Sequence, residues 1–536
     1  MSPGTGKADR IHKIEDIVIV GGGDAGLMTA LALKNSNQSL NITIIDDFDE
    51  PIPQIGKSTI SYIVNFLHEI LDIEITKFNN EVHPVWKGSV YFESWGDRGP
   101  FQIPFDGYSL DPPQLGARRF EVSYLRHQNR DFLTLGEEMV RQRKTPISDN
   151  GEMYTQVAYH LSLERFNTFL RKECEQAGIT LTDDRIIDVE ADSNWVTRIS
   201  GESESYRADL YLDASGYDPA LMSHLDNEFK SFDFPLDSAV VSKSAIELDE
   251  IVPATVINSG ECGWFWQIDT YDWRDVGYVY SSSYISQEDA IAEFRQAHPE
   301  TKENPINTYS FESGMLDRAW IGNCVAIGNT LGFVEPLQST ALTLNAMLTE
   351  YLAELIGNHH SMNHTGIRNI YNANARDIWL NTFDFVSLHY HFAKGDTPFW
   401  QEVSSGSPSQ RLQQYIDHYQ ENGFMSHEEF DRRGAELSLF GTYLYFQLMR
   451  ELGVRSEFFD EVDLEISQSV TNTMDRRKQH IKDNCASLLE YPEVYQKGLD
   501  DPFSVILRET SVAQPPQTRG RSQPRKGNQR PSRTRR

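Results

Sequence analysis

The chain has 536 residues, a formal net charge of −30 at pH 7 and 39% hydrophobic residues. That hydrophobic content suffices for a packed core and excludes a wholly disordered protein. The four cysteines are widely separated, which argues against a disulfide scaffold or a zinc ribbon and favours the reducing cytoplasm. No apolar run approaches the ~20 residues of a membrane-spanning helix, and the N-terminus lacks the apolar core of a secretory signal.

The charge is unevenly distributed along the chain. Residues 511–536 carry eight arginines or lysines and no acidic residue, and their low complexity predicts a disordered basic tail. The acidic remainder would repel nucleic acid and anionic membranes, so neither is an expected partner. The oligomeric state stays open, and a homo-oligomer is compatible with this composition.

The first predicted elements form a βαβ unit. A polar leader over 1–13 precedes a short apolar strand at 17–20, a glycine-rich turn at 21–26 and a helical pattern. The β-branched run at 42–46 predicts the next strand. Strand, turn, helix and strand in this order are typical of a nucleotide-binding fold.

The later elements alternate between helix and strand before the chain becomes helical. Helical spacing recurs at 61–75 and at 161–177. Short strands are predicted at 90–95, 101–105, 186–190 and 210–213. Residues 238–310 alternate and are rich in Tyr, Trp and Val, which indicates an antiparallel sheet. From 340 to 499 the pattern is mostly helical.

Three glycines of the early turn form a GxGxxG fingerprint. Gly21 permits the tight turn, Gly23 lets the backbone approach a pyrophosphate, and Gly26 lets the helix pack on the strand. Asp24 and Ala25 begin the helix, whose N-terminal N–H groups favour an anion. The spacing therefore predicts a bound dinucleotide, and a bare structural turn is the alternative.

A carboxylate for the ribose diol is expected at the end of the second strand. Asp46 lies 20 residues after the fingerprint, and Asp47 is the alternative. A second glycine fingerprint, which would suit NAD(P)H, is absent from the sequence. Strand-to-turn segments at 210–216 and 325–329 provide further walls for one cofactor, which favours FAD.

Several further segments resemble those of one enzyme family. They are IGKST at 55–59, WKG at 86–88, WFWQID at 264–269, NCVAIG at 323–328 and GFVEPLQST at 332–340. The last run is long and specific. Together with the glycine turn, these segments resemble the flavin-dependent halogenases of the tryptophan-halogenase family over roughly residues 15–455.

The resemblance implies an α/β fold and a mechanism. We expect a Rossmann-like, FAD-binding domain of the flavin monooxygenase type over 14–345, with an inserted β-sheet, followed by a mostly helical substrate domain over 346–510. A separate flavin reductase would supply reduced FAD, and oxygen and a halide would then give hypohalous acid inside the protein. A lysine would pass the halogen to an electron-rich aromatic substrate. Enclosure is needed because free hypohalous acid oxidises Met, Cys and Trp.

The resemblance also implies roles for single residues. Lys87 matches the active-site lysine, although a lysine snorkelling from a strand is the alternative. Gln338 occupies the position of the catalytic carboxylate beside that lysine. Trp264 and Trp266 match tunnel residues, with two core tryptophans on one strand face as the alternative. The remaining assignments are cofactor binding by Lys57, Ser58, Val189, Gly328 and Asn329, halide binding by the backbone of Thr340 and Ala341, and substrate contact by Ile103 and Phe105.

Four positions depart from the family's pattern. Lys57 stands where a glutamate is usual, and Asp269 replaces a proline. Gln338 replaces a glutamate and cannot take a proton, so Glu335 is the alternative base. Ile103 falls where tryptophan-specific members place a histidine.

We therefore expect an FAD-dependent halogenase that acts on an indole or phenol type of aromatic other than free tryptophan and tolerates bromide. Ile103 offers no hydrogen bond, and an apolar wall discriminates only weakly between substrates. A flavin-dependent hydroxylase is the first alternative, and a non-catalytic flavoprotein is the second. His389 and His391 lack a third ligand, so no metal is expected.

Overall fold

The structure is a computed structural model. It describes residues 12–50, 56–106, 121, 124–125, 128, 133–154, 156–358, 362–423, 438–462, 464–500 and 506–508. The expected polar leader lies outside the described residues except at its end, where β1 (His12–Lys13) pairs with β26 (Met362–Asn363). The expected basic tail at 511–536 lies outside them entirely.

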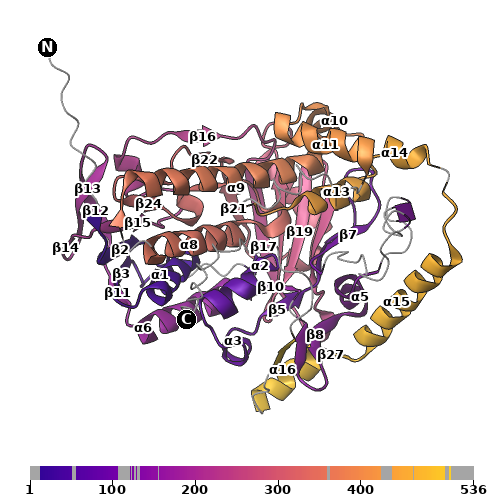
Figure 1. The fold of residues 1–536 in the computed structure, drawn as a ribbon, viewed down its shortest axis with the longest axis horizontal. Helices are drawn as coiled ribbons and strands as arrows, with labels where there is room; N and C mark the ends of the chain where they lie inside the picture. The colour runs from indigo at the N-terminus through magenta and orange to yellow at the C-terminus, as the bar shows by residue number, and fades with distance from the viewer. Residues whose placement is uncertain are drawn as a thin grey trace, which may run out of the picture.

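A six-stranded sheet forms the nucleotide-binding part of the molecule (Figure 1). β2 (Asp16–Val20) lies in its interior and is buried over its last four residues, which explains the continuous apolar run. All neighbouring pairs are parallel except the edge strand β23, which is antiparallel. The order is β11 (Thr180–Asp183), β3 (Asn41–Asp46), β2, β15 (Leu210–Asp213), β24 (Cys324–Ala326) and β23 (Trp320–Ile321).

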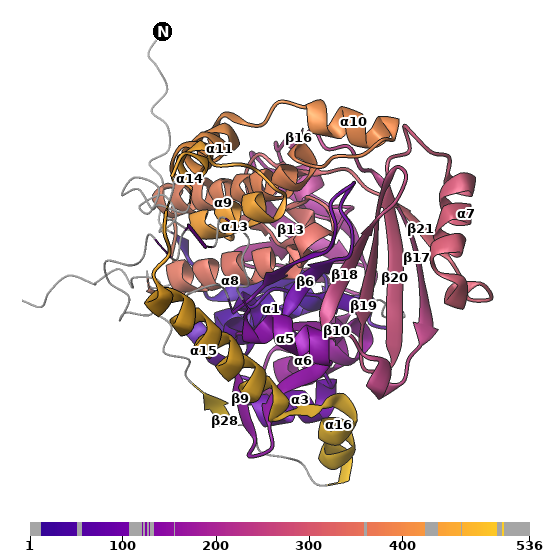
Figure 2. The ribbon, with the colours of Figure 1, turned by 90° about the vertical axis from the view of Figure 1, so that its right-hand side faces the viewer.

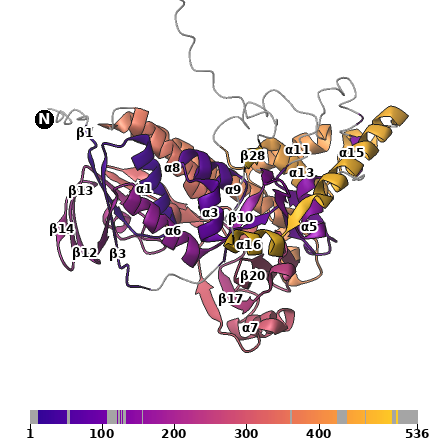
Figure 3. The ribbon, with the colours of Figure 1, turned by 90° about the horizontal axis from the view of Figure 1, so that it is seen from below.

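Helices pack together beside this sheet. α1 (Asp24–Ser36) packs against both α6 (Leu163–Gln176) and α8 (Ala341–Asn358), as Figure 3 shows from below. The Thr29 and Thr349 hydroxyls lie 2.8 Å apart between α1 and α8. The boundary expected between 345 and 346 falls inside α8, so the helical region continues directly from the nucleotide-binding part.

A seven-stranded sheet lies beside the nucleotide-binding part (Figure 2). It contains the antiparallel strands predicted within 238–310, and its last two strands come from earlier in the chain. α7 (Gln287–Ala297), which the sequence did not predict, packs on one face. The order is β21 (Asn307–Ser310), β17 (Ser238–Ala245), β20 (Trp273–Tyr280), β19 (Gly263–Asp269), β18 (Ala254–Ser259), β6 (Ser89–Phe92) and β7 (Phe101–Pro104).

A three-stranded antiparallel sheet contacts the seven-stranded one. It consists of β4 (Gly56–Ser58), β10 (Ala158–Ser162) and β5 (Val85–Lys87), with β10 in the middle. His160 pairs with Ser58 on one side and with Val85 on the other. Directly paired residues share a face, and so do residues two apart in one strand. Ser58, His160 and Lys87 therefore project from the same face.

The C-terminal part is mostly helical, as expected. α9 (Thr365–His391) packs along α8 and reaches the seven-stranded sheet with its last turn (Figure 1). In the described part of the chain, no helix has the length and apolar character needed to cross a membrane. The other helices here are α10 (Pro398–Ser405), α11 (Gln410–Asn422), α13 (Thr442–Glu451), α14 (Glu457–Asp460), α15 (Gln468–Ala486) and α16 (Tyr491–Asp500).

The helix predicted over 61–75 is divided in the structure. α2 (Tyr62–Asn65) continues into a π-helix that ends at Ile70. α3 (Ile75–Val82) then begins separately, because the carboxylate of Glu74 accepts the N–H groups of the first turn. The remaining elements are α5 (Leu135–Gln142) and the small sheets β12 (Ile186–Asp192), β13 (Trp195–Gly201), β14 (Ser205–Tyr206); β16 (Phe229–Ser231), β22 (Gly314–Leu316), β25 (Gly332–Phe333); and β27 (Leu488–Glu490), β8 (Lys144–Ser148), β9 (Glu152–Tyr154), β28 (Ile506–Arg508).

Candidate active site

The glycine turn has the geometry that its spacing predicts. Gly21 has φ +113°, and a Cβ added there would clash with the carbonyl oxygen of Ala214. A Cβ on Gly26 would clash with the carbonyl oxygen of Gly21. In contrast, a Cβ on Gly23 would meet no described atom within 4 Å. Gly21 and Gly26 are therefore required by local packing, whereas Gly23 faces open space.

That open space is a cleft between the glycine turn, the end of β3, β4, α6 and the start of α8. Asp47, the alternative ribose partner, also lines it. Val189 lies in β12 and is not among the residues found to line the cleft. The predicted cofactor or halide residues that line the cleft are Gly23, Asp24, Ala25, Asp46, Lys57, Gly328, Asn329 and Ala341.

The cleft has the features that a dinucleotide pyrophosphate requires. α1 begins at its wall, where the first N–H groups and the helix dipole favour an anion. Lys57 and Arg171 add two cations, and Lys57 Nζ lies 3.2 Å from Asp24 Oδ2. Asn167 Oδ1 is buried without a hydrogen-bond partner among the described atoms. The residues present therefore fit FAD.

Asp46 also supports the turn itself. Its Oδ2 accepts the Gly22 N–H at 2.8 Å. Burial raises the pKa of Asp46, while the bond from Gly22 and the charge of Arg171 act in the opposite direction. This carboxylate therefore fixes the position of the glycine turn relative to β3. Both Asp46 and Asp47 line the cleft, where either could accept hydrogen bonds from a ribose.

Lys87 is completely buried at the end of β5. Its Nζ donates at 2.6, 2.9 and 3.3 Å to the hydroxyl oxygens of Ser58, Thr255 and Ser339. The centroid of the Phe105 ring lies 5.1 Å from Nζ. Burial lowers the pKa of Lys87 well below its ordinary value, because the ammonium loses its hydration. A snorkelling lysine would keep its ammonium in water, so that alternative does not apply.

The lysine and the cleft are connected by two short chain segments. Lys57 lines the cleft, and the next residue, Ser58, contacts Lys87. Ala341 lines the cleft, and Ser339, two residues earlier, contacts the same lysine. The Lys87 ammonium therefore lies directly behind the cleft wall. Because Ala341 is the first residue of α8, the free N–H groups of that helix start favour an anion here.

The predicted substrate residues lie on the lysine's side of the seven-stranded sheet. Thr255 pairs with Val90, and Val90 pairs with Ile103, so these three side chains share a face. Phe105 follows two residues later and contacts Lys87 by its ring. Ile103 is buried and offers this region an apolar surface.

Trp264 and Trp266 lie on the same face of β19, with ring centroids 6.0 Å apart. The indole N–H of Trp264 donates to the Tyr390 hydroxyl at 3.0 Å, and that hydroxyl donates to a carboxylate oxygen of Glu335 at 2.8 Å. Burial raises the pKa of Glu335 to about 8. The polar partner of Glu335 is the Tyr390 hydroxyl. Both tryptophans are buried, which is compatible with a tunnel wall and with a hydrophobic core alike.

Gln338 differs from the sequence-based expectation. Its side-chain amide lies 2.9 Å from His389 Nε2 rather than on Lys87. His389 Nδ1 lies 3.0 Å from the Phe385 carbonyl, so Nδ1 carries the proton and Nε2 accepts from the amide. Gln338 and Ser339 have left-handed φ values of 64° and 56°. This backbone turns Gln338 toward α9 and brings Ser339, the next residue, to the lysine.

Sequence reasoning missed two groups of polar residues. In the cleft they are Asn167 and Arg171 of α6, which carry no motif. Beside the lysine, His160 Nε2 lies 2.9 Å from Thr255 Oγ1, and its Nδ1 lies 2.9 Å from the Asp269 carbonyl. A histidine inside the otherwise apolar stretch of β10 was the one available signal.

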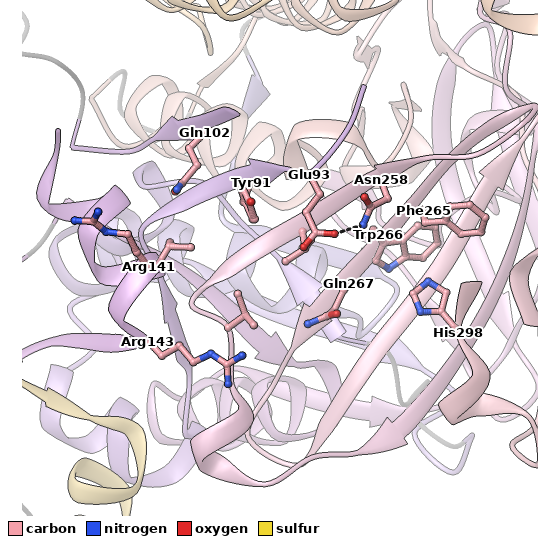
Figure 4. Close-up of a pocket in the computed structure, with 13 residues that line it drawn as sticks. Tyr91, Glu93, Gln102, Arg141, Arg143, Asn258, Phe265, Trp266, Gln267 and His298 are labelled. Atoms are coloured by element: carbon pink, nitrogen blue, oxygen red, sulfur yellow. Dashed lines mark hydrogen bonds between the residues drawn. The ribbon is translucent and has the colours of Figure 1, made fainter. Parts of the chain in front are cut away.

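A second hollow lies on the opposite face of the seven-stranded sheet (Figure 4). Successive side chains of a strand point to opposite faces. The residues next to Val90, Ile103 and Trp266 therefore face away from Lys87. Four of them line this hollow: Tyr91, Gln102, Phe265 and Gln267. The sheet separates the hollow from the lysine, so it is not part of the candidate active site.

Comparisons with known proteins agree with this geometry. The family model for tryptophan halogenase matches residues 16–465. Tryptophan 7-halogenase RebH of Lentzea aerocolonigenes is 28% identical over 450 residues, which cover 76% of this chain and 82% of that protein. Tryptophan 6-halogenase SttH of Streptomyces toxytricini is 26% identical over 442 residues, which cover 76% of this chain and 84% of that one.

Solved structures show the same fold. MibH, a lanthipeptide tryptophan 5-halogenase, superposes with a TM-score of 0.78 at 25% identity, over 93% of this chain and 96% of that one. BrvH, a flavin-dependent halogenase from Brevundimonas sp. BAL3, gives a TM-score of 0.76 at 23% identity, over 90% and 99%. The family match spans most of the chain. The matched range includes the cleft, the buried lysine and most of the helical region. The protein therefore belongs to the tryptophan halogenase family of flavin-dependent halogenases.

Proposed function

We propose that this enzyme uses FAD, reduced by a separate flavin reductase, to halogenate a neutral, electron-rich aromatic of the indole or phenol type rather than free tryptophan. Bromide is accepted as well as chloride, and the reaction takes place in the cytoplasm. The observation that supports this substrate class is the apolar Ile103 on the lysine's side of the sheet.

The cleft residues hold the cofactor and the halide. When bound, reduced FAD would donate electrons to oxygen and so activate it, and the activated oxygen would take electrons from the halide to give hypohalous acid. Lys57 and Arg171 balance the pyrophosphate charge, and Asp46 accepts hydrogen bonds from the ribose. The backbone N–H groups of Thr340 and Ala341 hold the halide at the start of α8.

Lys87 receives the hypohalous acid and directs its halogen to the substrate. An ammonium N–H donates to the acid's oxygen and polarises the halogen, whereas the neutral amine forms a haloamine instead. Because burial lowers the pKa of Lys87, the neutral form is more accessible than in a carboxylate-paired site. This favours tolerance of bromide, whose oxidised form is readily polarised.

Substrate choice follows from the wall that faces the lysine. A site that hydrogen-bonds a polar substrate group rejects analogues lacking it by ~10⁴-fold or more, whereas an apolar wall discriminates by only ~10- to 200-fold. Ile103 contributes an apolar surface to this wall and cannot form a side-chain hydrogen bond with a substrate. We therefore expect several neutral indoles and phenols to react, and the charged amino acid group of free tryptophan to find no partner at this position.

A panel assay tests the proposal. The purified enzyme, a flavin reductase and FAD are supplied with chloride or bromide, and products from indoles, phenols and free tryptophan are identified by mass spectrometry. We expect halide-dependent products from neutral aromatics, and Ile103→His should lower the preference for them over tryptophan. Efficient, regioselective chlorination of free tryptophan would contradict the substrate class. Products that gain oxygen without halide would indicate a hydroxylase.

A further inference from the structure

Lys87 is charge-bearing and buried, yet no ion pair joins it to a carboxylate within the part of the chain that the structure describes. Its three hydrogen-bond partners are neutral hydroxyls. Ring substitution releases a proton, and Gln338, at the position of the usual carboxylate, is held by His389. A proton acceptor for the lysine must therefore come from another element.

The hydrogen bonds around the lysine have a fixed direction. The Asp269 carbonyl can only accept, so His160 Nδ1 carries the proton and Nε2 is an acceptor. Thr255 must then donate its hydroxyl proton to Nε2 at 2.9 Å. Its remaining neighbour Ser58, at 2.7 Å, therefore donates to Thr255 Oγ1. Both hydroxyl oxygens keep lone pairs for Lys87.

From this direction we propose that His160, acting through the Thr255 hydroxyl, is the proton acceptor for Lys87. The inference rests on the proposed function of Lys87 in halogen delivery. His160 does not touch the lysine, so it is a positioning and relay residue, and Thr255 is the bridge. The two distances in the relay, Lys87 Nζ to Thr255 Oγ1 and Thr255 Oγ1 to His160 Nε2, are both 2.9 Å.

The proton step is balanced without any further reactant. An N–H bond of the Lys87 ammonium breaks and its proton forms a bond to Thr255 Oγ1, while the hydroxyl proton of Thr255 moves to His160 Nε2. The lysine becomes a neutral amine and the histidine becomes an imidazolium, so the net charge of the site does not change. The neutral amine can then take the proton that the ring releases.

The carboxylate of Asp269, whose carbonyl contacts His160, is already paired and does not compete with the histidine as a base. The Asp269 carboxylate on β19 is held by Arg274 at 2.8 Å and by the Val252 N–H at 2.9 Å. Burial lowers the pKa values of both Lys87 and His160, and the charge of Lys87 lowers the pKa of His160 further. The other titratable groups near the relay are Asp275 on β20, Lys57 on β4, Tyr159 on β10, and Tyr491 and Tyr495 on α16.

Product yield against pH tests the relay. The enzyme with pre-reduced FAD is mixed with oxygen, bromide and indole between pH 4 and 8, and bromoindole is measured per flavin oxidised. Because burial and the nearby Lys87 charge lower the pKa of His160, the wild type should lose yield only at the acidic end of this range, as His160 becomes protonated. Thr255→Val and His160→Gln should lower the yield roughly tenfold or more and remove this acidic limb. Thr255→Ser keeps the hydroxyl and should restore the limb.

Two controls separate the relay from other effects. Thr382→Val removes another buried hydroxyl, which bonds only within α9, and reports the cost of a cavity or a lost hydrogen bond elsewhere. Histidine ¹⁵N spectra of the flavin-free protein report the state of His160 without any turnover. There, Lys87→Met should raise the pKa of His160, because the neighbouring positive charge is gone.

The outcomes are distinguishable. If Thr255→Val matches Thr382→Val in yield and keeps the acidic limb, the relay is wrong even though halogenation stands. If the wild type makes no bromoindole but Lys87→Met raises the pKa of His160, the coupling between the two groups is supported and the proposed substrate class or activity is wrong. If Lys87→Met leaves His160 unchanged, the two groups are not coupled and the relay is overturned.

Discussion

Replacing Lys87 with methionine separates the chemical role of this residue from its structural role. Methionine has nearly the same length and volume, so the packing around β5 is preserved. The substitution removes the ammonium from its three hydroxyl partners. Those hydroxyls remain satisfied, because Ser58 bonds Thr255 at 2.7 Å and Ser339 at 2.8 Å.

The expected change in the free energy of unfolding is small. Each hydrogen bond from a charged donor contributes about 1.5–3 kcal/mol. Their loss is offset by the desolvation of a fully buried ammonium, which costs several kcal/mol. We therefore expect Lys87→Met to change the free energy of unfolding by less than about 2 kcal/mol in either direction, while product formation falls at least ~100-fold.

The assay measures three quantities on the same samples: halogenated product, flavin retained by the protein, and stability in urea. Flavin retention should be unchanged, since Lys87 is not among the residues that line the cleft. Lys57→Met, one residue from Ser58 and inside the cleft, is the matched control and should lower flavin retention instead. A Lys87→Met enzyme that halogenates at the wild-type rate would refute the reasoning.

Three further predictions concern the glycine turn and the buried pairs. Gly26→Ala should lower both stability and flavin retention because its Cβ would clash with backbone, whereas Gly23→Ala should lower flavin retention alone, as thermal melting with and without FAD will show. Gln338→Glu should lower the free energy of unfolding by about 1–3 kcal/mol at neutral pH, because a carboxylate would face the acceptor nitrogen of His389, and acidification should reduce this deficit. Burial raises the pKa of Glu335 from 4.5 to about 8, so the folded state binds its proton more tightly; relative to Glu335→Gln, wild-type stability should fall as pH rises from about 4.5 to 8, and urea titrations showing no such difference would contradict the burial argument.

The nucleotide-binding part could be predicted from sequence because its signals are local. Gly21, Gly23 and Gly26 stand within six residues, and each has the steric environment that its spacing implies. Asp46 ends the strand that follows, so its place beside the turn is set by one βαβ unit. In these cases, a few consecutive residues determine both the backbone and the position of the side chain.

The surroundings of Lys87 could not be predicted in this way. Ser58, His160, Thr255 and Ser339 come from four segments spread over about half of the chain. Ser58 and His160 meet Lys87 because β10 pairs with β4 and β5 in one register, and a shift by one residue would turn His160 to the other face. No local sequence pattern predicts the register in which β10 pairs with β4 and β5.

The turn at Gln338 shows a different limit. Sequence position alone places this residue beside the lysine, but the direction of its side chain depends on φ. Two successive non-glycine residues in the left-handed region cost about 1–3 kcal/mol each, so the surrounding contacts must hold them there. His389 supplies one such contact to Gln338, and Lys87 and Ser58 supply others to Ser339. The same turn directs the Gln338 amide away from Lys87 and brings the Ser339 hydroxyl to it. The Lys87 ammonium is therefore surrounded by neutral hydroxyl acceptors at a position where a carboxylate would otherwise stabilise its positive charge.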